Sequence, residues 1–248
     1  MVKRLAGCLL ALAFAPALRA QEAVAFDRPG IGFSTTTVPR GVVAWEQGLP
    51  DAAFSRDAGS RSRLLVADTL LRLGLTDALE LQVGADSHAW LHLHDGDGIR
   101  DAHGAGNASI GLKRALPAAQ AGFSWALLAS AGLPTGRAPV GGGERDYALG
   151  VTAQWALERE RSVSLYLDRG FGGERGWMLS PSYGFALGFD WAGYVEAGIG
   201  TGDRKGRLLG TGVTWQPSPR LQFDLSVLRG SGGAPDWQGG FGVALAFP

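Results

Sequence analysis

Apolar and polar side chains alternate strictly at the C-terminal end of the chain. Trp237, Phe241 and Phe247 fall on one face of an extended segment, and Gly240 and Ala244 fall on the other. Alternation with a period of two residues is the signature of a β-strand. The second face holds only small, weakly polar residues, where a soluble sheet would normally carry charges. This pattern is typical of membrane barrels, whose apolar side chains face lipid while small or polar ones face the lumen.

The same alternation recurs in about twelve stretches of the chain, and the connections between them are short and long in turn. Short turns at one rim and longer loops at the other are typical of outer-membrane barrels, and a Greek-key sandwich has no reason to show them. We therefore predict an all-β fold: a closed antiparallel transmembrane β-barrel of about 12 strands, with both chain ends at one rim. The strands are predicted to begin near residues 41, 63, 78, 106, 121, 146, 161, 177, 191, 207, 220 and 237, with long connections at 50–62, 95–105 and 133–145.

The first twenty residues have the layout of a secretory signal peptide. Lys3 and Arg4 precede an apolar run that ends near Leu18, and small residues lead to a cleavage site after Ala20. The run is shorter than the ~20 residues that a membrane-spanning helix needs. The predicted organisation is a signal peptide at 1–20, an N-terminal periplasmic or lumen segment at 21–40, and the barrel at 41–248.

Residues 21–40 show no apolar alternation. They contain Pro29 and Pro39, which cannot donate a hydrogen bond to a closed sheet. We predict that this segment lies at or inside the periplasmic mouth of the barrel, and the alternative is a disordered periplasmic tail. Inside the lumen, its charged residues would pair with the wall: Asp27 with Arg72 or Lys113, and Arg28 with Glu46, Glu80 or Glu196.

Charged residues on the predicted strands share the phase of the glycines and glutamines, so they are expected to face the lumen. A lysine or arginine facing lipid at mid-membrane would cost about 2–4 kcal/mol. The lumen and ligand-binding candidates among them are Glu46, Asp68, Arg72, Glu80, Lys113, Glu196 and Asp224.

Composition excludes several functions. The one cysteine, Cys8, lies in the predicted signal peptide, so the mature chain can form neither disulfides nor cysteine metal sites. The chain has 23 basic and 23 acidic residues, and loss of the signal peptide leaves it mildly negative. This balance gives no electrostatic reason to expect nucleic-acid binding.

All four histidines lie between residues 88 and 103. The inward phase of the third predicted strand runs through Glu80, and its continuation to about residue 94 places four further side chains on the inner wall near the outer mouth. These candidates for the lumen are His88, Trp90, His92 and His94.

A metal site is a second interpretation of this region. Two histidines at i and i+2 could share a borderline metal, and the following aspartates on a glycine turn suit a hard cation. The competing interpretations are a polar extracellular rim and a solvated acidic turn. The metal candidates are His92, His94, Asp95, Asp97 and Asp101.

Several motifs resemble a known family. They are the Asp27-Arg28-Pro29-Gly30 opening with Val38-Pro39-Arg40-Gly41, the Gly74-Leu75-Thr76-Asp77-Ala78-Leu79-Glu80 hairpin, Gly106-Asn107-Ala108-Ser109-Ile110-Gly111, and Leu133-Pro134-Thr135-Gly136. They resemble the outer-membrane "transporter" proteins of the meta-pathway of phenol degradation, although Asn107 stands where that family has an acid. The resemblance implies an outer-membrane barrel that passes aromatic or other small organic compounds.

We therefore expect a channel or transporter for small organic solutes, aromatic or hydrophobic ones included, in the outer membrane of a Gram-negative bacterium. The alternatives are a plugged structural or surface-binding barrel and, less favoured, a lipid-modifying enzyme. Ser87 and His88 are neighbours and face opposite sides of a strand, where a nucleophile cannot meet its base, so we predict no catalysis and no cofactor. Expected partners are outer-membrane lipid and lipopolysaccharide, the small-molecule solute, and the barrel-assembly machinery, which would recognise the terminal strand ending in Phe247.

Overall fold

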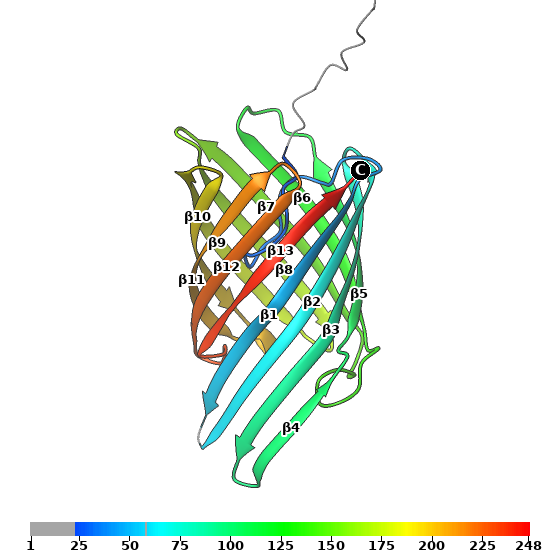
Figure 1. Cartoon of the computed structure of the whole chain (residues 1–248), viewed down its shortest axis with the longest axis vertical. Helices are drawn as coiled ribbons and strands as arrows, with labels where there is room; N and C mark the ends of the chain where they lie inside the picture. The colour runs from blue at the N-terminus through cyan, green and yellow to red at the C-terminus, as the bar shows by residue number, and fades with distance from the viewer. Residues whose placement is uncertain (1–22, 58) are drawn as a thin grey trace, which may run out of the picture.

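The chain forms one closed antiparallel barrel in the computed structural model, which describes residues 23–57 and 59–248 (Figure 1). Apart from β4, which pairs with β3 alone, each strand is paired on both sides. β1 (Val43–Asp57) pairs with β13 (Trp237–Phe247), so the sheet is closed. Closure pairs the backbone polar groups that lipid could not satisfy. The predicted fold is confirmed, and the signal peptide predicted for 1–20 lies outside the described residues.

Twelve strand positions make up the barrel. β4 pairs only with the outer half of β3, and β5 pairs with its inner half, so the two together occupy one position. A single turn of 3-10 helix, Gly202–Arg204, lies in one connection. The other strands are β2 (Ser60–Thr76), β3 (Leu79–Asp95), β4 (Gly98–Gly104), β5 (Ala108–Leu116), β6 (Phe123–Leu133), β7 (Asp146–Leu157), β8 (Arg161–Gly172), β9 (Gly176–Gly188), β10 (Trp191–Gly200), β11 (Gly206–Ser218) and β12 (Leu221–Ser231).

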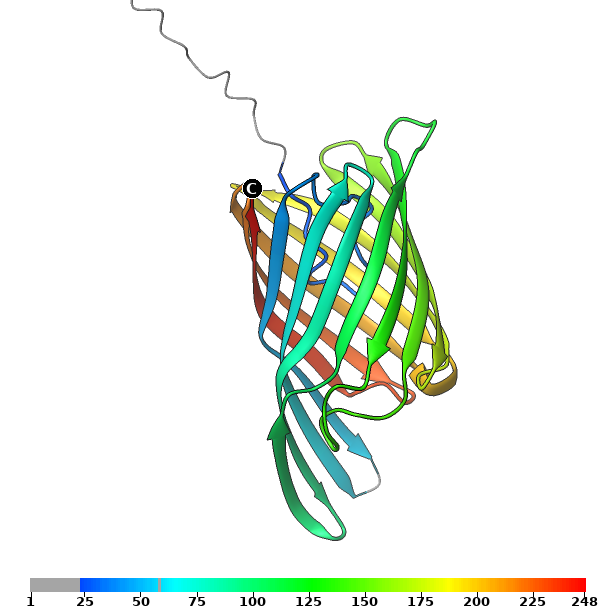
Figure 2. The same ribbon diagram turned by 90° about the vertical axis from the view of Figure 1, so that its right-hand side faces the viewer.

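Two of the predicted long connections, 50–62 and 95–105, are instead strands. β1 and β2 remain paired out to Asp57 and Ser60, and β3 and β4 out to Asp95 and Gly98. Both hairpins project beyond the rest of the barrel at the rim of long connections (Figure 2). Strands outside the membrane need no apolar face. Because their side chains are mostly polar, these strands lack the alternation that predicted the others.

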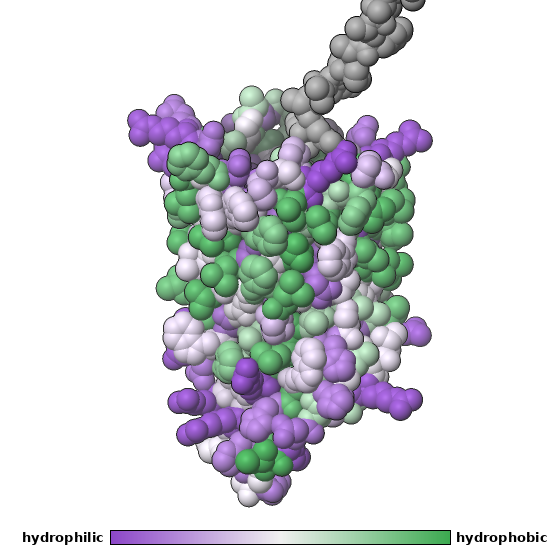
Figure 3. Space-filling model, in the orientation of Figure 1, coloured by the Kyte–Doolittle hydropathy of each residue, from purple (hydrophilic) through white to green (hydrophobic). Residues whose placement is uncertain are grey.

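An apolar belt crosses the visible face of the barrel between polar ends (Figure 3). Leu149, Leu225 and Ile199 are among the exposed apolar side chains of this belt. The opposite phase of the same strands holds buried polar residues such as Thr152, Asp224 and Glu196. Among the described residues, no helix is long and apolar enough to cross a membrane.

Two β-bulges shift the alternation near the middle of β1 and of β3. In β1 the register slips between Gly48 and Asp51 relative to both neighbouring strands, and in β3 it slips at Ser87, between Asp86 and His88. One extra residue in a strand moves every later side chain to the opposite face. The faces beyond these bulges are therefore the reverse of those expected from the inner halves of the strands.

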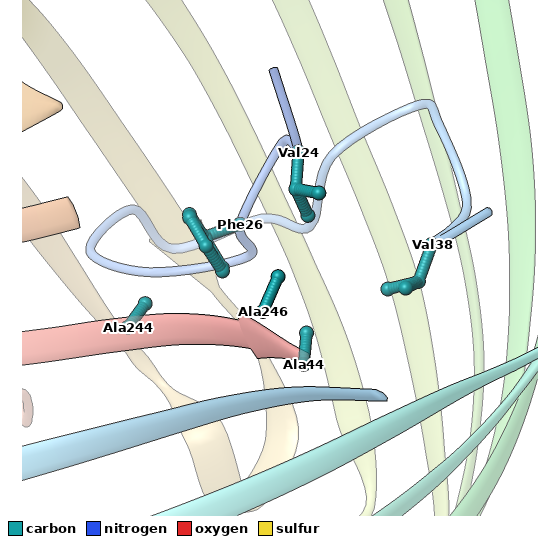
Figure 4. Packing of buried hydrophobic residues seen from close by; sticks show 6 residues of the cluster. All are labelled: Val24, Phe26, Val38, Ala44, Ala244 and Ala246. Atoms are coloured by element: carbon teal, nitrogen blue, oxygen red, sulfur yellow. The ribbon is translucent and has the colours of Figure 1, made fainter. Parts of the chain in front are cut away.

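The N-terminal segment, residues 23–40, enters the barrel at the rim of short turns and lies inside the lumen (Figure 2). It forms no strand or helix. Its apolar side chains Val24, Phe26 and Val38 are buried in a cluster with three small wall residues (Figure 4). Those wall residues are Ala44, Ala244 and Ala246, from β1 and β13.

Leu225→Arg tests the assignment of the lipid-facing phase. We expect the barrel to lose about 2–4 kcal/mol of unfolding free energy, the cost of an arginine at mid-membrane. The measurement is guanidinium unfolding of the barrel in lipid vesicles. Ser226→Arg places the same charge one residue further on, towards the lumen, and should lose less. Equal losses for the two variants would contradict the assigned phase.

Candidate functional site in the lumen

Arg72 of β2 is the centre of a buried network of charges in the lumen. Its Nε and Nη2 donate to the Glu80 carboxylate of β3 at 2.8 and 3.0 Å, and its Nη1 donates to Glu46 Oε1 of β1 at 2.8 Å. Nη1 also donates to the Ala25 carbonyl oxygen at 3.0 Å. All three side chains are fully buried. One guanidinium therefore joins three strands to the N-terminal segment.

Asp27 joins the same network from the N-terminal segment. Its Oδ1 accepts a hydrogen bond from Lys113 Nζ of β5 at 2.8 Å and lies 3.5 Å from Arg72 Nη1. Its Oδ2 accepts from Gln82 Nε2 at 2.9 Å. The partners of Asp27 are those expected from the sequence, because the lumen-facing phase of β2 and β5 is uninterrupted at this depth.

Arg28 pairs with a different set of carboxylates from the one predicted. Its Nη1 lies 2.7 Å from Asp51 and 3.2 Å from Asp68, and its Nη2 lies 3.3 Å from Asp224. Of the expected partners, only Glu46 meets this residue, by accepting the backbone N–H at 2.8 Å. The β1 bulge explains the contact with Asp51, since it turns Asp51 into the lumen from a stretch predicted to be a loop. Asp68 and Asp224 were expected in the lumen but not as partners of Arg28.

Carboxylates of the wall also satisfy backbone N–H groups of the segment. Glu46 accepts from the Asp27 amide, Glu196 of β10 accepts from the Ile31 amide at 2.9 Å, and Glu80 accepts from the Val38 amide at 2.7 Å. A buried amide without a partner costs about as much as a lost hydrogen bond. These glutamates therefore take the place of the backbone hydrogen bonds that a paired strand would have and that the segment lacks.

The segment divides the lumen into two cavities. One, of about 380 Å³, lies on the side of Asp51, Asp68 and β12. The other, of about 260 Å³, lies between residues 26–33 and the wall made by β7 to β11. The wall of this second cavity is rich in hydroxyl groups. They belong to Thr152, Ser162, Ser164, Ser180, Ser182 and Thr214.

Three buried polar atoms at the second cavity have no hydrogen-bond partner within the described part of the chain. They are Thr152 Oγ1, the Tyr194 hydroxyl and Glu196 Oε1. Buried polar groups are normally paired, so these atoms are available to water or to a polar solute. Phe33 and Tyr166 add aromatic surface to the same cavity, with ring centroids 5.6 Å apart in an edge-to-face arrangement.

The four residues predicted to line the outer mouth lie on the outer face instead. The β3 bulge at Ser87 pairs His88 with Ala67, Trp90 with Leu65, and His92 with Arg63. Those β2 residues share the phase of Leu71 and Leu73, which are exposed on the lipid side. His94, opposite Arg61, follows the same phase. The inward position passes to Leu91, which pairs with the lumen residue Leu64.

The five metal candidates do not gather into one cluster. His92 Nδ1 lies 2.6 Å from Asp101 Oδ1, while Asp95 accepts the Asp97 amide and pairs with Arg100. Those two hydrogen bonds hold the pKa of Asp95 below its ordinary value. Within residues 23–57 and 59–248, no three histidine, cysteine, aspartate or glutamate side chains are arranged to hold a metal ion.

Sequence reasoning missed the hydroxyl wall and the role of Asp51. The signal for the first was present, because Ser162 and Ser164 recur at i and i+2 in β8, as do Ser180 and Ser182 in β9. Asp51 carried no such signal, since the bulge that orients it shows only in the paired register. The remaining lumen candidates, Glu46, Asp68, Arg72, Glu80, Lys113, Glu196 and Asp224, all contact the N-terminal segment or the network that holds it.

Arg72→Met should destabilise the barrel by about 3–5 kcal/mol, because it leaves Glu46 and Glu80 buried without their cation. Guanidinium unfolding of the refolded protein measures the loss. Arg72→Lys is the matched control, since it keeps the charge, and it should lose less than Arg72→Met. A methionine variant as stable as the lysine variant would show that the charge of Arg72 does not hold the network.

Comparison with solved structures finds other barrels. The COG4313 outer membrane channel from Pseudomonas putida F1 superposes with a TM-score of 0.66 at 14% identity, covering 88% of this chain and 99% of that one. The KdgM porin superposes with a TM-score of 0.56 at 11% identity, covering 84% of this chain and 99% of that one. These similarities show the fold. A search of curated proteins gives no match.

The similarity at the level of sequence extends over almost the whole barrel and includes the segment inside it. Residues 26–247 match the family described as "Putative MetA-pathway of phenol degradation". This range begins within the segment that lies inside the lumen and ends at Phe247, the residue that pairs with Val43 to close the sheet. The chain therefore belongs to this family.

Proposed function

We propose that this protein is an outer-membrane channel for small organic solutes, in which residues 23–40 narrow the lumen and solutes pass along the hydroxyl-lined side. The observation that carries the proposal is the one-sided distribution of the segment's ion pairs. The salt bridges of Asp27 and Arg28 reach β1, β2, β5 and β12 only. The wall formed by β7 to β9 makes no ion pair with the segment within the described residues.

The hydroxyl-lined cavity continues towards the rim of short turns. It shares Ser162, Gly184, Tyr194 and Thr214 with an opening of about 740 Å³ that also includes Pro217 and Pro219. On its other side, it shares the lining residues Arg28, Pro29 and Gly30 with the cavity beside β12. A small movement of these three residues would join the two cavities into one passage.

The lining favours neutral or cationic solutes that carry hydrogen-bonding groups. Glu196 of this lining keeps a buried oxygen without a partner among the described residues. The adjoining cavity is lined by Asp27, Glu46, Asp51 and Asp68, and carboxylates along a passage disfavour anions. Hydroxyls together with Phe33 and Tyr166 suit an aromatic ring that bears a hydroxyl group. The phenol degradation named in the description of the family is compatible with such a solute.

The passage proposed here crosses the outer membrane of a Gram-negative bacterium, with short turns in the periplasm and long connections outside, the arrangement usual for such barrels. Lipopolysaccharide, outer-membrane lipid and the barrel-assembly machinery are the partners that this location supplies. A catalytic role has little support, because the Ser87 hydroxyl meets Thr69 Oγ1 at 2.5 Å and His88 lies against Trp90 and His103.

Arg28→Gln should raise single-channel conductance in a planar bilayer, because it weakens the attachment of the segment to three carboxylates. Arg40→Gln is the matched control, since it removes the same charge from an exposed position of the same segment, outside the network. Deletion of residues 24–38 should raise the conductance further. The plugged structural barrel predicts negligible conductance for the intact chain. Equal conductance of the intact and deleted chains would contradict a narrowing role for the segment.

Ser182→Trp should lower the conductance by filling the cavity between the segment and β8 to β10. The neighbouring Tyr183→Trp provides the control, because residue 183 pairs with Val163 on the lipid side and leaves the cavity unchanged. Flux of a small phenolic solute into liposomes gives a second measurement. If both variants conduct as the parent does, the passage does not follow this wall.

A further inference from the structure

The outer face of the projecting hairpins carries a row of basic and aromatic side chains. Strand register aligns these residues across five strands, because each pairs with the next. They continue the phase of Leu71, Leu73 and Leu225, which face lipid further in. The row consists of Arg229, Trp237, Phe54, Arg63 and His92, from β12, β13, β1, β2 and β3 in that order.

A basic groove of about 900 Å³ follows this row. Four arginines, Arg56, Arg61, Arg63 and Arg229, line it together with Phe54 and Trp237. The aromatic rings hold two of the cations in place: the Arg63 guanidinium lies 5.6 Å from the Phe54 ring centroid, and that of Arg229 lies 4.9 Å from Trp237. Arginine presents a planar fork of donors that matches phosphate oxygens.

An apolar groove of about 830 Å³ lies directly beside the basic one. Leu49, Pro50, Leu65, Ala67 and Trp90 line it, and it shares Arg63 and His92 with its neighbour. The next row of paired residues towards the membrane, from Val227 through Gly239 and Ala52 to Leu65 and Trp90, carries no charge. The two grooves therefore form one continuous surface that changes from apolar to cationic where the lipid belt ends.

The acidic side chains nearby do not neutralise this surface. Asp236 accepts the Arg56 amide at 2.8 Å and lies 3.8 Å from Arg229, and Asp101 is bonded to His92. Arg56, Arg61 and Arg63 are exposed, and no carboxylate of residues 23–57 or 59–248 lies within ion-pair distance of them. Three adjacent cations thus remain available at the lipid boundary.

We propose that these grooves bind one phosphorylated glycolipid of the outer leaflet, with its phosphates on Arg56, Arg61 and Arg63 and an acyl chain along Leu65 and Trp90. The charge of the surface selects an anionic head, and the apolar groove beside it selects an amphiphile over a free anion. The orientation rests on the proposed function, which places the long connections outside the cell, but the binding surface itself does not.

The test measures binding of diphosphoryl lipid A to the purified full chain in detergent, by native mass spectrometry and tryptophan fluorescence. The Arg56→Gln, Arg61→Gln, Arg63→Gln variant should bind at least about tenfold more weakly, equivalent to about 1.4 kcal/mol. Lipid A stripped of its phosphates should bind the parent as weakly as that variant does. The affinity should fall between about 0.1 M and about 1 M salt, as the Debye length shrinks from ~10 to ~3 Å.

The matched control removes three exposed arginines elsewhere at the same rim, by Arg137→Gln, Arg145→Gln and Arg175→Gln. It should bind as the parent does. Equal weakening in both triple variants, or equal binding of the phosphate-free lipid by the parent, overturns the proposal, and so does full competition by millimolar inorganic phosphate. If the first triple variant loses heat-modifiable folding, the single variants Arg63→Gln and Arg63→Lys are compared instead. Arg63→Gln should then weaken binding, and Arg63→Lys should retain most of the affinity. Conductance is measured separately, so failure of this site and failure of the channel are distinguishable.

Discussion

The structure depends on carboxylates of the barrel wall that accept hydrogen bonds from a segment with no secondary structure. Glu46, Glu80 and Glu196 each bind backbone amides of residues 27–38. Arg72 supplies a cation to Glu46 and Glu80, and Arg28 of the segment supplies one to Asp51 and Asp224 of the wall. The segment and the wall therefore stabilise each other, since each satisfies polar groups that the other would leave buried and unpaired.

The second constraint is the two-residue period of a strand. Because of this period, every second side chain faces lipid. The alternation between Trp237 and Phe247 therefore predicted a membrane barrel. The same period makes the pattern fragile, because one inserted residue reverses it. The bulge at Ser87 moves His88, Trp90 and His92 to the outer face, and the bulge between Gly48 and Asp51 brings Asp51 to Arg28.

This difference explains which parts of the site could be predicted from sequence. Lys113 and Arg72 lie in regular stretches, so counting by twos placed them in the lumen and paired them with Asp27. The contact of Asp51 with Arg28 and the face of His92 depend on bulges, which are a property of paired strands and not of one strand alone. The outer parts of the two hairpins were not predicted as strands either, because strands exposed to water on both faces show no apolar alternation.

The two sides of the lumen wall have different roles: one holds the N-terminal segment, and the other lines the passage for solutes. A wall whose charges are already paired, such as that around Arg72, offers a solute few free polar atoms and holds the segment in place. A wall of serine and threonine hydroxyls can exchange hydrogen bonds with successive solutes, because no single bond is strong enough to trap them. The unpaired atoms of Thr152, Tyr194 and Glu196 lie on this second wall. The segment therefore narrows the barrel while its ion pairs lie on one side only, and the chemistry of the other side decides which molecules fit past it.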